Sequence, residues 1–305
     1  MDNAARRILV FGCNGQVGHE LTRALSGLGR VTALDRSRAD LSQPESLRDI
    51  VRHHEPDIIV NAAAYTAVDR AESEPELAHA VNATAPGVLA EEAQASGACL
   101  VHYSTDYVFD GKKNSPYREE DPTSPLSVYG RSKLAGELAV AGACERHVIF
   151  RTSWVFGVHG SNFLKTILRV AADRDSLQVV ADQFGAPTSA GLIAKLTCKF
   201  LKQILPAREK DARWGLYHLA AAGEASWHAY ARHVIARGHQ IGIPLKAAPD
   251  SVAPISTTSY PVAAPRPANS RLDTSKLRSA LAVDLPDWRG DVDEVIQELY
   301  SLQTR

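Results

Sequence analysis

The sequence predicts an α/β protein with a doubly wound parallel sheet and a smaller C-terminal lobe. Apolar strand-like segments alternate with helix-like segments over the first half of the 305 residues, which is typical of a parallel sheet covered by helices on both faces. A glycine-rich turn directly follows the first strand-like segment, and the alternation loosens after Trp154. We therefore expect residues 1–155 to form one domain and residues 156–305 to form mainly a second lobe, with some later segments returning to the sheet.

The first domain is expected to contain five strands, each a short apolar run that is buried between helices. These strands span residues 8–11, 30–34, 57–60, 98–103 and 147–151. Helices are expected at residues 17–28, 42–54, 75–82, 83–95 and 127–141, and the second of them has the capping-box spacing of Ser42 and Glu45. The second half is expected to form helices at residues 162–172, 192–205, 226–237 and 292–302, and strands at residues 177–181 and 216–218.

The composition is that of an ordinary globular protein, with 45% hydrophobic residues, 23% charged residues and a formal net charge of −1. Because there is no basic surplus, we expect neither nucleic acid nor a membrane as a partner. No apolar run is long enough to cross a bilayer, and the amino-terminal residues lead into the first strand without room for a secretory signal. The 4 cysteines and 11 histidines show no metal or disulfide spacing, so we expect reduced thiols, no zinc site and a cytoplasmic location.

The turn after the first strand has the pattern of a dinucleotide-binding motif. Gly12, Gly15 and Gly18 recur at three-residue spacing and open a helix. Glycine permits the sharp turn and the close approach of a pyrophosphate, which the N–H groups of the helix then face. The glycines alone are also typical of an ordinary β–α turn, but Asp35 lies 20 residues after Gly15, where such folds place a ribose-binding acid. Arg36 and Arg38 follow and could bind a 2′-phosphate instead, so the choice between NAD and NADP stays open.

The helix expected at residues 127–141 carries Tyr129 and Lys133, which are four residues apart and therefore share a face. An ammonium beside a phenol favours the phenolate and lowers its pKa, so the pair can act as an acid–base device. This spacing alone more often marks a solvated helix face. Its position one β–α unit after Thr105, and downstream of the glycine motif, favours catalysis instead. Thr105, at the carboxyl end of a strand, can donate a hydrogen bond to a substrate carbonyl oxygen.

Together these motifs resemble the extended short-chain dehydrogenase/reductase superfamily. Within it, several further stretches are similar to one branch, the dTDP-4-dehydrorhamnose reductases. These stretches are residues 61–69, 102–111, 150–154, 182–188 and 266–272. The likeness runs from about residue 8 to residue 299, so it covers nearly the whole chain.

The resemblance implies that NADH or NADPH reduces the 4-keto group of a dTDP-sugar, dTDP-4-dehydro-L-rhamnose, to give dTDP-L-rhamnose. The first domain would then bind the dinucleotide and the second lobe would bind the substrate. By the same resemblance, Tyr129 protonates the emerging alkoxide, Lys133 holds the nicotinamide ribose, and Thr105 orients the carbonyl.

The resemblance also implies which other residues form the site. Those implied to line the dinucleotide, besides Tyr129 and Lys133, are Gly12, Gly15, Gln16, Val17, Gly18, Asp35, Arg36, Asp40, Leu41, Ala63, Ala64, Tyr65 and Thr66. Asp106 and Trp154 are implied to contact the sugar with Thr105, although a tryptophan at a strand end is equally typical of a core aromatic. Arg266 and Arg271 could meet the nucleotide diphosphate.

The resemblance also bears on whether the protein binds a metal ion and forms a dimer. Some members bind magnesium through three glutamates at a dimer contact. Glu20 and Glu298 match two of these positions, but Gly191 occupies the third. Losing a carboxylate removes both a ligand and a charge, so we expect a weak magnesium site or none, and either a monomer or a homodimer.

Two other functions stay open at this point. The regulatory β subunit of methionine adenosyltransferase is similar but has no need of Thr105, Tyr129 and Lys133, which are intact here. A nucleotide-sugar epimerase or dehydratase would share the dinucleotide site. A dehydratase would need an acid and a base beside Tyr129, whereas Thr105 is followed by Asp106 and the aromatic Tyr107.

Overall fold

The computed structural model describes residues 5–205 and 213–303, so the expectation about the amino-terminal residues 1–4 lies outside it. Its centre is a six-stranded sheet in which every neighbouring pair is parallel. The strands, in spatial order, are β10 (Gly215–His218), β5 (His147–Thr152), β4 (Cys99–Thr105), β3 (Ile58–Asn61), β1 (Arg6–Phe11) and β2 (Gly29–Leu34). The chain reverses its direction of growth between β1 and β3, which is the point where open α/β sheets bind ligands. The fold class is therefore the predicted one.

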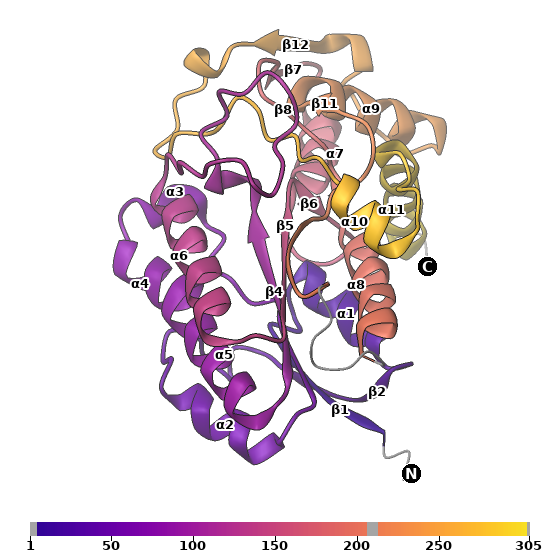
Figure 1. Ribbon diagram of the computed structural model, residues 1–305. Helices are drawn as coiled ribbons and strands as arrows, with labels where there is room; N and C mark the ends of the chain where they lie inside the picture. The colour runs from indigo at the N-terminus through magenta and orange to yellow at the C-terminus, as the bar shows by residue number, and fades with distance from the viewer. Residues whose placement is uncertain (1–4, 206–212, 304–305) are drawn as a thin grey trace.

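Helices cover both faces of this sheet (Figure 1). On one face α1 (Gln16–Leu25) packs against α8 (Ala190–Ile204), and on the other α5 (Ala85–Ser96) packs between α2 (Ser46–His54) and α6 (Val128–Ala143). Side chains of a strand alternate between the two faces. Accordingly Ile8 and Val10 of β1 join the core under α1 and α8, while Leu9 and Phe11 join the core under α5. Burial on both faces explains the continuously apolar strands.

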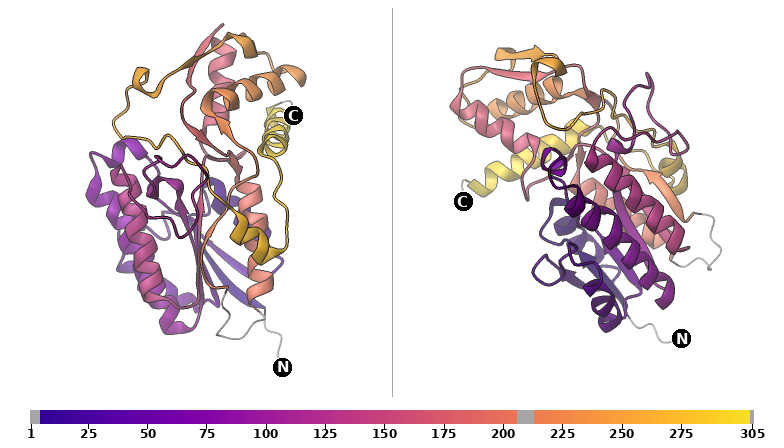
Figure 2. Two further views of the ribbon diagram at one scale, coloured as in Figure 1. Left: turned by 45° about the horizontal axis from the view of Figure 1, so that its top comes forward. Right: turned by 90° about the vertical axis from the view of Figure 1, so that its left-hand side faces the viewer.

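The second half of the chain contributes both to this sheet and to a separate lobe above it. Strand β10 is part of the sheet and helix α8 packs with α1 over one of its faces, although both follow residue 155 in sequence. The lobe seen at the top of both views in Figure 2 packs helices around short strand pairs. Its main elements are α7 (Phe163–Asp173), β7 (Leu177–Val180), α9 (Trp227–Gln240), β12 (Val252–Ile255) and α11 (Trp288–Gln303).

Two predicted details are wrong, each for a local reason. The helix expected from residue 42 begins at Ser46, because the Ser42 N–H bonds to the Asp40 carboxylate and the capping box does not form. The separate helices expected at residues 75–82 and 83–95 are continuous, since a π-turn (Ala80–Thr84) joins α4 (Pro75–His79) to α5. The short helix α10 (Ser275–Leu281) was not predicted. None of the helices in the described part of the chain is long and apolar enough to span a membrane.

Candidate active site

The glycine turn lies at the carboxyl end of β1 and leads into α1. Gly12 has a φ of +77°, and a Cβ atom there would come within 2.7 Å of the Ala63 backbone at the end of β3. A Cβ on Gly18 would come within 2.0 Å of the Gly12 carbonyl oxygen, so only glycine permits the helix to start this close to the turn. Gly15 is the N-cap and offers no side-chain cap, which leaves the first N–H groups of α1 for an anion.

A cavity of about 570 Å³ opens at the carboxyl ends of β1 and β3. Every residue that the sequence analysis assigned to the dinucleotide lines it, except Gly18, which packs behind the turn. The lining includes Gly12, Gly15, Gln16, Val17, Asp35, Arg36, Asp40, Leu41, Ala63, Ala64, Tyr65, Thr66, Tyr129 and Lys133. Residues far apart in the sequence are thus gathered around one space of a size suited to a dinucleotide.

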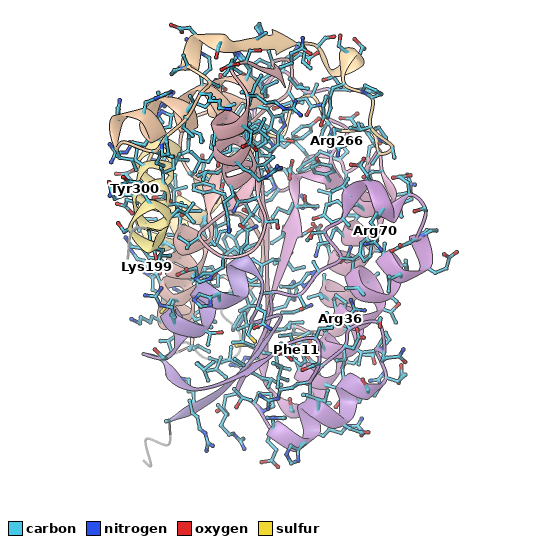
Figure 3. All side chains as sticks on the ribbon, turned by 180° about the vertical axis from the view of Figure 1, so that it is seen from behind. Phe11, Arg36, Arg70, Lys199, Arg266 and Tyr300 are labelled. Carbon is cyan, nitrogen blue, oxygen red and sulfur yellow. The ribbon has the colours of Figure 1, made fainter. Side chains whose placement is uncertain are left out.

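Asp35 and Arg36 both line this cavity, at the end where the sequence predicts a ribose. The Asp35 carboxylate accepts hydrogen bonds from the Ser37 N–H and hydroxyl, at 3.0 and 2.6 Å, and these bonds lower its pKa. Arg36 is exposed and reaches Asp40 at 3.4 Å. Figure 3 shows Arg36 on the sheet domain, with Arg266 lying nearer the C-terminal lobe. Asp35 and Arg36 both line the cavity, so a ribose hydroxyl could meet the carboxylate and a 2′-phosphate could meet the guanidinium, and the geometry accommodates both NAD and NADP.

Helix α6 brings Tyr129 and Lys133 into the same cavity. The helix starts where predicted, because the Ser127 side chain accepts a hydrogen bond from the Gly130 N–H. Both side chains are buried, and Lys133 Nζ donates to the Tyr103 carbonyl oxygen at 2.6 Å. Burial lowers the pKa of Lys133 to about 8, while the charge of Glu137 acts in the opposite direction.

The predicted lowering of the Tyr129 pKa is wrong. Burial of the phenol raises its pKa, the negative charge of Asp106 raises it further, and a hydrogen bond with Thr105 opposes them only in part. Lys133 is turned to the Tyr103 carbonyl and does not outweigh the loss of water around the phenol. Tyr129 is therefore protonated at neutral pH and can act as a proton donor.

Thr105 and Asp106 form a buried pair at the end of β4. Thr105 Oγ1 donates to Asp106 Oδ1 at 2.9 Å. Burial raises the pKa of Asp106 to about 6, against the effect of Ser270 and Thr105. The contact with Ser270 lacks full hydrogen-bond geometry, so Asp106 Oδ2 is a buried acceptor with no hydrogen-bond partner. Neither Thr105 nor Asp106 lines the 570 Å³ cavity itself, but both act on the Tyr129 phenol that does.

Two residues that line the cavity, and one residue that supports its wall, were missed from the sequence. Ser104 Oγ and Thr152 Oγ1 are buried without a hydrogen-bond partner, and both residues line the cavity. Unsatisfied hydroxyls in such a place suit a polar ligand. Asn82, in the π-turn, bonds to the N–H and carbonyl of Tyr65 at 2.8 and 3.0 Å and to the Ser132 hydroxyl at 3.0 Å. It thereby ties the loop that lines the cavity to helix α6. Ser104 and Thr152 could have been predicted, because each lies at the carboxyl end of a strand. No local sequence feature predicts the role of Asn82.

Trp154 is neither a plain core residue nor a part of this cavity. Its φ of +50° is in the left-handed region, which is unusual for a bulky residue and often marks functional sites. Its ring stacks on Trp227 at 3.6 Å. Trp227 in turn lines a second cavity of about 420 Å³, together with Phe163, Gln183 and Arg266.

The two arginines of the C-terminal segment are held in place. Arg266 lines the second cavity and makes a two-point ion pair with Asp69, with Nη2 at 2.7 Å from Oδ2 and Nη1 at 3.1 Å from Oδ1. Asp69 is in α3 (Val68–Ala71), directly after the loop that lines the first cavity. Arg271 pairs with Glu224 at 2.9 Å and lines neither cavity. Arg266 is thus the better placed of the two to meet a ligand.

The expected magnesium ligands do not gather into a site of three acids. Among the described residues, the group that could hold a metal ion is His19, Glu20 and His159, so the histidines are less scattered than the sequence suggests. The centroids of the two imidazole rings are 3.6 Å apart with the rings tilted by 35°, and the Glu20 carboxylate is 3.9 Å from Arg23. Glu298 is not in this group and lines a separate surface recess with Asp293 and Glu294. Gly191 supplies no ligand, so the residues present do not fit a three-glutamate site within one chain.

The fold and cavity define a dinucleotide-binding protein with the tyrosine–lysine pair of the extended short-chain dehydrogenases. Residues 6–301 match the family model described as the RmlD substrate binding domain. The chain is 49% identical over 296 residues to a dTDP-4-dehydrorhamnose reductase of Burkholderia thailandensis, with 97% of this chain and 99% of that protein covered. It is 48% identical over 298 residues to the Escherichia coli K12 dTDP-4-dehydrorhamnose reductase, covering 96% and 98%. The chain belongs to this family.

Comparison with solved structures supports membership of this family. A dTDP-4-dehydrorhamnose reductase from Bacillus anthracis in complex with NADP superposes with a TM-score of 0.88 at 32% identity, and the match covers 96% of this chain and 99% of that one. A UDP-glucose 4-epimerase from Thermus thermophilus in complex with NAD matches with a TM-score of 0.76 at 20% identity, covering 96% and 99%, which shows only a shared fold.

Proposed function

We propose that this protein catalyses the reduction of the 4-keto group of dTDP-4-dehydro-L-rhamnose by NADPH or NADH, giving dTDP-L-rhamnose. The observation that carries this function is the first cavity, which combines the glycine turn with the Tyr129 and Lys133 side chains of α6. Membership of the reductase family supplies the substrate class. Residues 1–155 are proposed as the dinucleotide-binding domain and residues 156–305 as mainly the substrate-binding lobe.

The bound nicotinamide cofactor would supply hydride to the carbonyl carbon. This chain would supply the proton: Tyr129, whose pKa burial raises, is protonated and donates to the oxygen as negative charge develops there. Thr105, which interacts with Tyr129, is proposed to orient that oxygen, and Lys133 is proposed to hold the cofactor ribose. The unpartnered Asp106 Oδ2 is proposed to accept a hydrogen bond from a sugar hydroxyl.

We infer that the nucleotide part of the substrate occupies the second cavity. Phe163 and Trp227 offer aromatic faces there, and Arg266 offers a guanidinium for a diphosphate. The Arg266–Asp69 pair connects the rims of the two cavities, so a substrate that spans them would pass this ion pair. Trp154, stacked on Trp227, is then placed to contact the sugar.

The decisive experiment is an assay of NADPH and NADH oxidation with the keto-sugar nucleotide as substrate, with the product identified by mass spectrometry. Cofactor oxidation coupled to dTDP-L-rhamnose formation supports a reductase. A silent assay combined with tight binding to another protein would favour the regulatory subunit. A cofactor that stays bound and returns to its starting redox state would favour an epimerase.

The chain is further proposed to be cytoplasmic. It is also proposed to be a monomer or homodimer, and sedimentation with and without Mg²⁺ would test this oligomeric state.

A further inference from the structure

A buried polar chain lies directly behind the catalytic lysine. His102 is on β4 and is completely inaccessible to solvent. Its Nδ1 is 3.3 Å from Asn61 Nδ2, and its Nε2 is 3.5 Å from Lys133 Nζ. The pairing of β3 with β4 places Asn61 and His102 directly side by side, so the first contact is fixed by the sheet. His102 therefore connects the end of β3 to the only ammonium in the dinucleotide cavity among the described residues.

The orientation of the Asn61 amide decides which nitrogen of His102 carries a proton. The Ala63 N–H donates to Asn61 Oδ1 at 3.2 Å, which identifies that atom as the oxygen. The amide NH₂ group of Asn61 therefore faces His102, and Nδ1 must accept its hydrogen bond. A neutral imidazole has one N–H, so this proton is on Nε2.

His102 stays neutral at working pH. Its burial lowers its pKa well below the usual value, and the charges of Lys133 and His147 lower it further. The Nε2–H bond therefore points at Lys133 Nζ. An ammonium has only donors and cannot accept this N–H, whereas an unprotonated amine has a lone pair that can. The second contact of Lys133, to the Tyr103 carbonyl, is available in both protonation states.

Other charged groups around Lys133 do not remove this effect. Glu137 is the acid whose charge favours the protonated lysine, but Arg151 neutralises it through two bonds of 2.8 and 2.6 Å. Asp106 acts on the neighbouring Tyr129, and the electrostatic effect of His147 on β5 falls on His102 and not on Lys133. His102 is thus the polar side chain that contacts Nζ from the strand side.

We propose that His102 is a positioning residue that stabilises the unprotonated amine of Lys133 during turnover. This proposal rests on the proposed function. When Tyr129 has given its proton to the sugar oxygen, a phenolate remains. Lys133 lies on the same face of α6 as Tyr129 and lines the same cavity, so it is placed to return a proton to the phenolate. Its pKa, which burial lowers to about 8, favours that transfer. The lone pair left on Nζ then accepts the hydrogen bond from His102 Nε2–H, and solvent later reprotonates the amine. No proton leaves His102.

The first test needs no substrate. The ¹⁵N signals of His102 are measured by NMR in the full chain, with assignment by a His102→Gln variant. We expect an unprotonated Nδ1 and a protonated Nε2 at neutral pH, without titration of the ring down to about pH 5. A proton on Nδ1, or a ring that titrates near its ordinary pKa, would overturn the proposal. Since this result does not depend on turnover, it can fail while the reductase activity holds, and the reverse is also true.

The second test compares two substitutions of the same residue. His102→Phe removes the N–H, whereas the amide of His102→Gln can accept from Asn61 and still donate to Lys133. We expect His102→Phe to lower kcat about tenfold and to shift the alkaline limb of the kcat/KM profile upward, with His102→Gln close to wild type. His147→Gln, on the neighbouring strand, is the matched control and should change neither. A purely structural role would lower kcat in both His102 variants without moving the limb, which would refute the proposal.

Discussion

Lys133 Nζ lies 2.6 Å from the carbonyl oxygen of Tyr103. The lysine is therefore held by the backbone of β4, the strand that also carries Thr105, and not by the phenol one helical turn before it. Burial of this ammonium disfavours its charge. Tyr129 is consequently the weaker acid of the two and Lys133 the stronger one, the reverse of what the spacing alone suggests.

The activity should decrease at alkaline pH. The pKa of Lys133 is lowered to about 8, so the ammonium that is proposed to hold the ribose is lost as the pH rises through 8. A profile of kcat/KM against pH should fall above about pH 8, and the limb should be absent in Lys133→Met at its much lower activity. A profile that stays flat to pH 10 would show that the pKa of Lys133 is not lowered. The free energy of unfolding should change in the opposite direction. Between pH 8 and 10.5 the folded chain binds fewer protons at Lys133 than the unfolded chain does, so the cost of burying this lysine decreases as the pH rises.

Asp106 should reduce stability at neutral pH. Its folded pKa of about 6 exceeds the ordinary value of 3.8, so the folded chain holds this proton more tightly and loses stability as the pH rises from 3.8 to 6. Asp106→Asn keeps the shape without the charge. We expect it to raise the free energy of unfolding by about 3 kcal/mol at pH 7.5, on the scale of ~1.4 kcal/mol per pKa unit, and by much less at pH 4. Urea denaturation at both pH values measures this, and a gain that is equal at the two would contradict it.

Arg36 should decide how well NADPH binds. A guanidinium at the ribose end of the cavity can pair with a 2′-phosphate, which NADH lacks. Arg36→Ala should weaken NADPH binding about tenfold, which is ~1.4 kcal/mol, and leave the Kd for NADH within about twofold. Titration of intrinsic fluorescence with each cofactor gives both constants. Equal weakening of both would mean that the arginine supports the loop and does not read the phosphate.

Gly12 should tolerate no side chain. Its φ is +77°, and a Cβ would lie 2.7 Å from backbone atoms of Ala63. Gly12→Ala should lower the free energy of unfolding by about 3 kcal/mol and abolish measurable cofactor binding. Gly27→Ala is the matched control, because a Cβ there meets no atom within 4 Å, and it should change stability by less than about 0.5 kcal/mol. Thermal unfolding of the two variants side by side makes the comparison, and similar losses would refute the argument.

The sequence predicted most of the residues that line the first cavity, because its signals are local. Strand ends, glycine spacing and the four-residue interval from Tyr129 to Lys133 are all readable in the chain, and the strands then converge at one sheet edge. Long-range packing was not readable. The contacts of Asn82 with Tyr65 and of Trp154 with Trp227 join residues from separate elements, and no periodicity marks them. The direction of the Tyr129 pKa shift was predicted wrongly, because the sequence shows the lysine four residues away but does not show that the phenol is buried.

The most direct measurement is the turnover of Tyr129→Phe with dTDP-4-dehydro-L-rhamnose and NADPH, alongside its cofactor affinity. The phenyl ring keeps the packing of the phenol but cannot donate a proton. We predict that kcat falls by at least about 100-fold while the Kd for NADPH stays within about twofold of wild type. Turnover within a few-fold of wild type would contradict the assignment of Tyr129 as the proton donor, and with it the central claim of a reductase built on this cavity.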